Sequence, residues 1–298
     1  MKIVYFFDGL GNQMFQYAYY KALRNKEKNI YANLDAYKRD YSQNIKDFNG
    51  YELKRIFNVN VEEKKVLGDN FFSRTRWKKI NVMIKIIHKI LRILNIIIYI
   101  ENWNESIEER LSKKRVYFLT GWWQSEKFFK DIEEEIKKDF TFPKIKDEKN
   151  KEIENMISKT DSVSIHVRRG DYIKDKGFGG LTPLEYYQKG IDYIKSKVKN
   201  PVYFVFSNDI EWCKKNLEVK EQIYYIDWNK NEESYKDMQL MSLCKYNIIA
   251  NSSFSWWGAW LNNNPNKVVI APEKWFNDCI KMDYSNIIPK NWIKIKNY

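Results

Sequence analysis

Residues 162–171 of the chain are Ser-Val-Ser-Ile-His-Val-Arg-Arg-Gly-Asp. Val163, Ile165 and Val167 alternate with more polar residues, which predicts a short, half-buried strand. Gly170 supplies the turn after it. Because open α/β sheets bind ligands just beyond the carboxyl ends of their strands, a ligand-binding edge is expected directly after Val167.

The residues that follow this strand suit an anionic ligand. Arg168 and Arg169 carry guanidinium groups, whose paired N–H donors match the oxygens of a phosphate. His166 lies two residues before Arg168, so both side chains should point to the same side of the strand. The alternative is a solvated turn in which an arginine pairs with Asp171 and no ligand binds.

The second half of the chain alternates strands with helices. Strands are expected at 202–206, 222–226, 247–250 and 267–271, and helices at 182–197, at 232–246 and after Ser255. Repeated units of this kind predict a parallel sheet with helices on both faces. Polar residues at 166–171, 207–209 and 251–255 would meet at one edge of that sheet and form a pocket for a phosphorylated nucleoside. Ordinary helix capping is the alternative for each segment alone.

The first half opens on a similar unit. Residues 2–7 predict a strand, residues 8–13 a glycine-rich turn, and the residues from Met14 onward a helix. Met14 stands where a dinucleotide fingerprint has its third glycine, so the turn brings backbone close to a ligand without specifying a dinucleotide. The lysine-rich stretch 143–160 marks the expected boundary, which gives domains 1–155 and 156–298.

Composition narrows the class of partner. The 298 residues include 52 Lys and Arg against 39 Asp and Glu, and the net charge of +13 indicates nucleic acid, a membrane face or a phosphorylated substrate. Because the lysines are dispersed and no RNA- or DNA-binding signature occurs, a nucleic-acid-binding protein ranks far behind an enzyme. The short apolar start has no signal-peptide pattern, so a cytoplasmic protein is expected.

No metal site is expected. The three cysteines lie far apart, and no two aspartates are separated by a single residue, the pattern with which many sugar transferases hold a divalent metal. A bound diphosphate would then be neutralised by Arg168 and by helix N-termini.

Residues 80–100 carry an apolar stripe at helical spacing, interrupted by Lys85, His88, Lys89 and Arg92. Charges in the middle of the segment argue against a transmembrane helix. A core helix and a basic amphipathic helix in peripheral contact with the inner membrane both remain open.

Four motifs together resemble bacterial alpha-1,2-fucosyltransferases of glycosyltransferase family 11. They are GLGNQMFQ at 9–16, GWWQSE at 121–126, HVRRGDY at 166–172 and NSSFSWWGAW at 251–260. The resemblance implies a GT-B fold, in which two Rossmann-like domains face each other across a cleft. Residues 1–155 would be the acceptor-side domain, and residues 156–298 the domain that binds the GDP-sugar donor.

The activity that the resemblance implies is transfer of L-fucose from GDP-fucose to the 2-hydroxyl of a galactose, with inversion and without a metal or other cofactor. The acceptor would be a galactose-terminated glycan, as in lipopolysaccharide or O-antigen biosynthesis. Transfer of another GDP-6-deoxyhexose is the alternative within the same class.

The resemblance also assigns roles to residues. Arg168 would hold the β-phosphate and stabilise the departing GDP, and Asp237 would bind guanine. The donor site as a whole would comprise His166, Arg168, Arg169, Asn208, Asp237, Ser252, Ser253 and Phe254. The acceptor side would comprise Asn12, Gln13 and Trp123.

The catalytic candidates are Arg168, Asp171 and Asn12. The general base stays open between Asp171, Asp175, Asp8 and none, since stabilisation of the leaving group can dominate such a reaction. Asp171 could instead orient an arginine.

Overall fold

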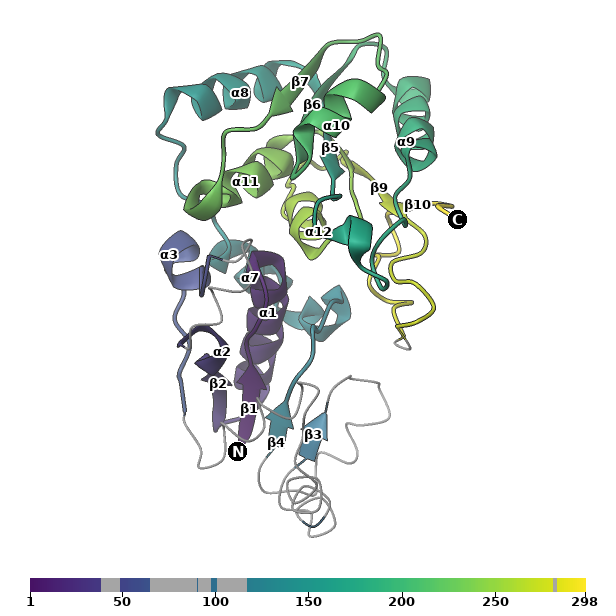
Figure 1. Ribbon diagram of the computed structural model, residues 1–298. Coiled ribbons are helices and arrows are strands. Elements are labelled where there is room, and N and C mark those ends of the chain that lie inside the picture. Colours follow the sequence, from purple (N-terminus) through teal and green to yellow (C-terminus); the bar gives the residue numbers. More distant parts are fainter. Residues whose placement is uncertain (39–48, 65–89, 91–97, 101–116, 281–282) are drawn as a thin grey trace. The chain divides into compact units, whose positions relative to one another are not determined.

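The computed structural model describes residues 1–38, 49–64, 90, 98–100, 117–280 and 283–298 (Figure 1). The chain divides into two compact units, Met1–Asp139 and Phe140–Tyr298. Each unit contains a sheet whose strands all run parallel, accompanied by helices. The predicted α/β class with parallel sheets is therefore confirmed.

The described residues of the first unit form a four-stranded sheet in the order β2-β1-β4-β3. Its strands are β1 (Lys2–Tyr5), β2 (Ile30–Asn33), β3 (Ile98–Ile100) and β4 (Tyr117–Leu119). Its described helices include α1 (Leu10–Lys26), α2 (Asp35–Lys38), α3 (Leu53–Phe57) and α7 (Glu133–Asp139), the last preceded by 3-10 turns at Glu126–Phe128 and Lys130–Ile132. The glycine-rich turn thus leads from β1 into α1, as the sequence predicts.

In the second unit, residues 140–280 and 283–298 form a six-stranded sheet in the order β10-β9-β8-β5-β6-β7. Its strands are β5 (Asp161–Val167), β6 (Pro201–Ser207), β7 (Ile223–Ile226), β8 (Tyr246–Ile248), β9 (Val268–Pro272) and β10 (Ile293–Ile295). Its α-helices are α8 (Glu148–Lys159), α9 (Leu184–Lys197), α10 (Ile210–Asn216), α11 (Tyr235–Leu243) and α12 (Ser253–Trp260), with 3-10 turns at Tyr172–Lys174 and Asn231–Glu233.

Strand β5 lies at the centre of this sheet and is buried on both faces. Val163, Ile165 and Val167 pack with side chains of α9 and α10. On the opposite face Ser164 is 1% exposed, and its Oγ accepts a hydrogen bond from Asn247 Nδ2 at 2.7 Å. The prediction of a half-buried strand was therefore wrong. The central strands of a parallel sheet are covered by helices on both sides, and here hydrogen bonds satisfy the hydroxyls of Ser162 and Ser164.

Both sheets contain a topological switch point. In the first unit β1 lies between β2, which follows it in the chain, and β4, which comes much later. In the second unit β5 lies in the same way between β6 and β8. Where the connections after two adjacent strands run in opposite directions, a crevice opens at the carboxyl ends of those strands. Ligands of α/β proteins bind in this crevice. Ligand-binding residues are therefore expected after β1 and β4, and after β5 and β8.

Two further expectations concern the domain boundary and the segment 80–100. The expected boundary at residue 155 falls inside α8, whose Ile153 and Ile157 pack in the core of the second unit. Most of the segment 80–100 lies outside the described residues, but its end, Ile98–Ile100, forms strand β3 and does not continue a helix. None of the helices within the described ranges is both long and apolar enough to span a bilayer.

Candidate functional site

The carboxyl end of β5 carries a cluster of polar side chains at the switch point of the second unit. Arg168 Nη2 donates to Asp171 Oδ2 at 2.8 Å. The Arg168 guanidinium carbon also lies 5.6 Å from the ring centre of Tyr172. The hydroxyl of Tyr172 donates to the backbone oxygen of Asn251 at 3.4 Å, in the loop that follows β8. The ends of β5 and β8 are therefore joined through these side chains.

His166 lies on β5, two residues before Arg168, and is buried, with 5% of its surface exposed. Its ring centre is 5.9 Å from that of Phe254 on α12, and its Nδ1 makes no hydrogen bond with the described residues. Burial, reinforced by the charge of Arg168, lowers the pKa of His166 to about 3. The imidazole is therefore neutral at neutral pH and keeps an unsatisfied polar atom beside the cluster.

Asn208, just after β6, holds the turn that follows β5. Its Oδ1 accepts from the backbone N–H groups of Arg169 at 2.9 Å and Gly170 at 3.2 Å. Its Nδ2 donates to Asp171 Oδ1 at 3.1 Å. A Cβ atom at Gly170 would lie 2.6 Å from Asn208 Nδ2, so a larger residue would force the Asn208 amide out of this position. Asp171 is thus bound at both oxygens, by Asn208 and by Arg168.

Arg169 is engaged at the start of α10. Its Nε donates to Asp209 Oδ2 at 3.2 Å, and its guanidinium lies 4.0 Å from the ring centre of Trp212. Asp209 also caps α10 by accepting from the backbone N–H of Trp212. Arg168 and Arg169 are thus each paired with a carboxylate, Arg168 with Asp171 after β5 and Arg169 with Asp209 at the start of α10.

The start of α12 completes this cluster. Ser252 is the N-cap, and its Oγ accepts from the backbone N–H of Phe254 at 3.4 Å. Ser253 and Phe254 form the first turn and are half-buried. Trp256 and Trp257, also on α12, are fully buried and serve the core, so they are not available to stack on sugars.

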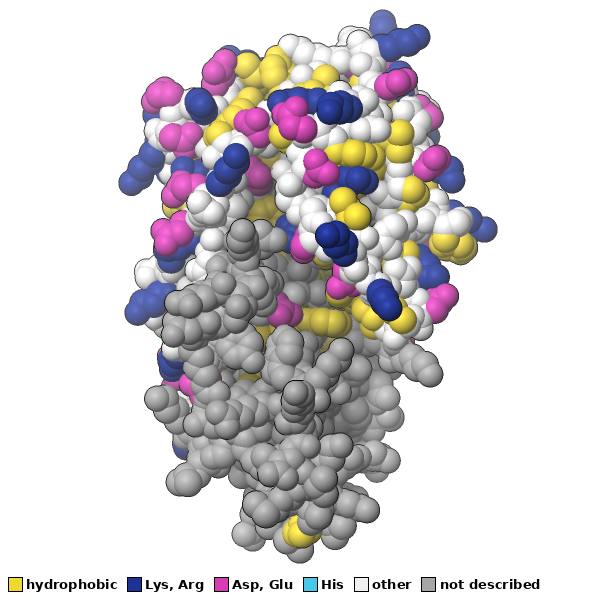
Figure 2. All heavy atoms as spheres, in the orientation of Figure 1, with side chains coloured by type: hydrophobic (Ala, Val, Ile, Leu, Met, Phe, Trp, Pro, Cys, Tyr) yellow, Lys and Arg dark blue, Asp and Glu magenta, His cyan; other side chains and the backbone are white. Residues whose placement is uncertain are grey.

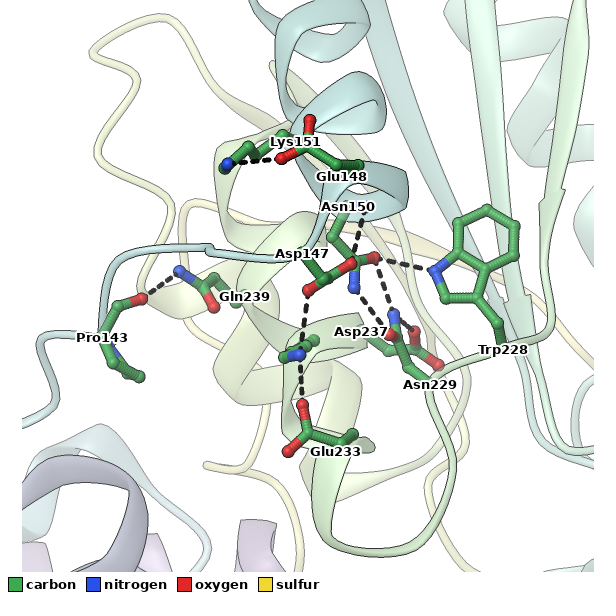
Figure 3. Close-up of polar contacts among 11 residues, drawn as sticks. Pro143, Asp147, Glu148, Asn150, Lys151, Trp228, Asn229, Glu233, Asp237 and Gln239 are labelled. Carbon is green, nitrogen blue, oxygen red and sulfur yellow. Dashed lines mark hydrogen bonds and ion pairs between the residues drawn. The ribbon is translucent and has the colours of Figure 1, made fainter.

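Asp237 lies in the first turn of α11, within a second polar network (Figure 3). Asn229 Nδ2 donates to Asp237 Oδ1 at 2.8 Å. Desolvation raises the pKa of Asp237 to about 8, and the hydrogen bond from Asn229 opposes this shift. Helix α11, which carries Asp237, packs against α12, which carries Phe254.

The first unit also brings polar side chains together, at the ends of β1 and β4. Asp8 Oδ2 accepts from Trp122 Nε1 at 2.8 Å and from Asn12 Nδ2 at 3.4 Å. Asn12 Oδ1 accepts from Gln124 Nε2 at 2.7 Å. The backbone of Asp8 has a φ of 66°, a left-handed conformation that is uncommon for non-glycine residues and recurs at functional sites. Asn12 is therefore held between the two strand ends.

The other predicted acceptor-side residues support the scaffold. Gln13 is fully buried, and its amide bonds the backbone of Asp8, Gly50 and Glu52. Trp123 is 4% exposed and stacks on Tyr19, with ring centres 4.0 Å apart. Of the three predicted residues, Asn12 is the one whose side chain lies in the cluster at the strand ends.

Charge and metal-binding groups show no further concentrated site in the described part of the chain. Figure 2 shows Lys and Arg side chains of the second unit spread among Asp and Glu, without one basic patch on the visible face. Within the described ranges, no group of three or more His, Cys, Asp and Glu side chains is placed to hold a metal ion.

Comparison with known proteins identifies the family. The profile described as Glycosyl transferase family 11 matches residues 2–296. This chain belongs to glycosyl transferase family 11. An alpha-1,2-colitosyltransferase of Escherichia coli is 36% identical to it over 301 residues, which cover 97% of this chain and 96% of that protein.

Further relatives of this family 11 glycosyltransferase match over shorter stretches or with lower identity. The O-antigen biosynthesis glycosyltransferase WbnK of Escherichia coli is 42% identical over 45% of this chain and 44% of its own length. Galactoside alpha-(1,2)-fucosyltransferase 1 of Homo sapiens is 26% identical over 48% of this chain and 42% of its own. The crystal structure of NodZ alpha-1,6-fucosyltransferase soaked with GDP-fucose aligns with a TM-score of 0.44 and 13% identity, over 87% of this chain and 91% of that one.

Sequence reasoning missed some residues that the structure of this family 11 enzyme brings to the networks. Asn229 bonds Asp237, and Asn150 bonds Asn229. Asn150 lies in the lysine-rich stretch 143–160, which the composition marks as the expected domain boundary. Its spacing from Ile153 and Ile157 places it on the buried face of α8, and this periodicity is the signal that could have identified it.

Proposed function

We propose that this family 11 glycosyltransferase moves L-fucose from GDP-fucose to the 2-hydroxyl of a terminal galactose, with inversion and without a metal or other cofactor. The acceptor is a surface glycan such as an O-antigen. The proposal is supported by the motif resemblance and by relatives named as alpha-1,2-transferases and as an O-antigen enzyme. The observation that carries it is the cluster of His166, Arg168 and Phe254 at the switch point of the second unit.

In this proposal Arg168 binds the β-phosphate and stabilises the charge that develops on departing GDP. A guanidinium can donate to two phosphate oxygens at once. Because Asp171 already fixes one side of Arg168, the group needs little reorganisation during the reaction. Neutral His166 contacts the nucleotide without adding charge, and Ser252 and Ser253 add hydroxyl donors.

The guanine base of the donor and the acceptor glycan bind to different units in the proposal. Asp237 binds guanine in the second unit, which acts as the donor domain. Asn12 binds the acceptor in the first unit, and the units form the GT-B arrangement that the resemblance implies. The enzyme would work in the cytoplasm in peripheral contact with the inner membrane, and sedimentation with liposomes checks that location.

The carboxylates that could accept the proton of the acceptor hydroxyl differ in their contacts. Both oxygens of Asp171 are engaged, which suits the role of orienting Arg168. Asp175 Oδ1 accepts from the backbone N–H groups of Gly177 and Phe178 and so shapes a turn. Asp8 accepts hydrogen bonds from the indole of Trp122 and from the amide of Asn12 on the acceptor-side turn, so we assign proton acceptance to Asp8.

Transfer of a colitosyl group is the second candidate function. It is favoured by the 36% identity to an alpha-1,2-colitosyltransferase over 97% of this chain. A donor panel separates the two candidates: GDP release is measured with lactose present, once with GDP-fucose and once with a GDP-linked colitosyl donor. Faster release and transfer with GDP-fucose support the first function, and the reverse order supports the second. Absence of GDP binding contradicts both.

A further inference from the structure

A pair of buried amides, Asn150 on α8 and Asn229 after β7, lies next to Asp237, and none of the roles above uses it (Figure 3). Asn150 is 1% exposed and Asn229 is 9% exposed. Asn150 Nδ2 donates to Asn229 Oδ1 at 2.8 Å, and Asn229 Nδ2 donates to Asn150 Oδ1 at 3.1 Å. Buried amides cost free energy unless their polar atoms are bonded, so this pair requires a physical reason.

The indole of Trp228 fixes the orientation of the pair. Its Nε1 lies 3.0 Å from Asn150 Oδ1, and an indole N–H can only donate. The Asn150 atom that faces Trp228 must therefore be the oxygen, and its amide nitrogen must face Asn229. Asn229 then presents its own oxygen to Asn150, and its Nδ2 hydrogens point to Asn150 Oδ1 and to Asp237 Oδ1. The indole N–H of Trp228 therefore determines which atom donates in each hydrogen bond of Asn150 and Asn229.

The surroundings keep cations away from the bonded oxygen of Asp237. Asp147 caps α8 by accepting from the backbone N–H of Asn150, and it also accepts from Lys236 Nζ at 2.9 Å. Lys236 pairs with Glu233 as well. The starts of α8 and α11 are thus tied together, and the lysine next to Asp237 in sequence is occupied by carboxylates. A neutral amide faces Asp237 Oδ1.

We propose that Trp228, Asn150 and Asn229 form a positioning device that holds the Asp237 carboxylate in one orientation and thereby selects guanine over other bases. The inference rests on the proposed function, in which Asp237 binds the base of the donor. Asn229 occupies one lone pair of Oδ1. The second lone pair and Oδ2 then accept from the N1–H and the 2-amino group of guanine, which lie side by side. Adenine presents an acceptor at N1 and lacks the 2-amino group, so it leaves this carboxylate unmatched.

The test compares binding of GDP and ADP by calorimetry, with the wild-type protein and with Asn229→Leu. The ratio of the two dissociation constants cancels effects on the phosphate site. We expect Asn229→Leu to lower the preference for GDP by about tenfold or more, because a mispositioned carboxylate loses paired hydrogen bonds. Trp228→Phe removes the indole N–H and keeps an aromatic ring, so it should lower the preference in the same direction but less.

Asn155→Leu is the matched control, since Asn155 is an exposed asparagine on the same helix as Asn150. It should leave the GDP preference unchanged. If wild-type protein prefers GDP but both Asn229→Leu and Trp228→Phe retain the full ratio, the positioning role is overturned and the proposed function stands. If Asn229→Leu does not fold, Trp228→Phe decides. If wild-type protein shows no preference for GDP over ADP, the proposed donor is wrong and the inference is overturned with it.

Discussion

The guanidinium of Arg168 donates to the carboxylate of Asp171 across 2.8 Å, and Asn208 bonds the other oxygen of the same carboxylate. In the proposed mechanism Arg168 binds the phosphate, and Asp171 acts on that site by setting the direction of the arginine. This division of roles can be tested by substituting each residue separately.

Arg168→Ala should lower turnover about 100- to 1,000-fold and weaken GDP binding, because stabilisation of the leaving group is lost. Asp171→Asn should cost about tenfold, equivalent to one charge-assisted hydrogen bond, and should raise KM for the donor along with lowering kcat. Steady-state kinetics and GDP titration measure both. A turnover with Asp171→Asn as low as with Arg168→Ala, with GDP affinity intact, would identify Asp171 as the proton acceptor instead.

Gly170 and Asn208 should be energetically coupled. Gly170→Ala places a Cβ where Asn208 Nδ2 now lies, so the amide must leave and its bonds to the turn are lost. We expect Gly170→Ala and Asn208→Ala each to lower the free energy of unfolding by about 1 to 3 kcal/mol. The double variant should cost less than the sum by roughly 1 kcal/mol, since both changes remove the same bonds. Additive costs in urea unfolding would show that the packing does not couple them.

The preference for GDP over ADP should increase with pH. The pKa of Asp237 is raised to about 8, so the carboxyl is mostly neutral at neutral pH, whereas guanine donors need the anion. Below that pKa the ratio of affinities should fall about tenfold per pH unit, and above it the ratio should level off. Other ionisable side chains near Asp237 have partners of their own, since Lys236 pairs with both Asp147 and Glu233. Helix α12, which packs against α11, carries no ionisable side chain.

Asp237→Asn is the control for this pH dependence. It keeps an oxygen for Asn229 but cannot ionise, so its preference for GDP should be weak and independent of pH. Calorimetric titrations of both nucleotides between about pH 6 and about pH 9 span the transition. A wild-type preference that stays constant across this range would show that the ionisation of Asp237 has no part in base binding.

Asp8→Gly should separate activity from stability in the first unit. Glycine adopts the left-handed backbone of position 8 without strain, which offsets the loss of the hydrogen bonds from Trp122 and Asn12, so the free energy of unfolding should stay within about 1 kcal/mol of the wild-type value. It also removes the carboxylate beside Asn12, so transfer should fall at least about tenfold while GDP binding is retained.

Asn29→Gly is the matched control, because Asn29 is exposed and has a φ of 67°. Asn29→Gly should relieve the same backbone strain and leave transfer unchanged. Wild-type transfer rates with Asp8→Gly would remove Asp8 from the mechanism.

The sequence predicts the strands and the polar strand ends well, because these follow from local alternation and turn residues. Arg168 and His166 were placed correctly on one strand end for this reason. The partners of Arg169 depend on α10 and Trp212, which no local pattern assigns to it. The burial of Trp123 against Tyr19 is likewise a tertiary contact, and it changes a predicted sugar-binding ring into a core residue. Orientation of amides such as Asn150 requires the three-dimensional position of a donor.

The central claim is tested most directly by the product formed from GDP-fucose and lactose in the presence of a metal chelator. NMR spectroscopy of that product reports both the linkage position and the anomeric configuration. We expect fucose alpha-linked to the 2-hydroxyl of galactose with wild-type protein, and little product with Arg168→Ala. Transfer that requires a metal, or a wild-type protein that neither binds GDP nor forms this product, would contradict it.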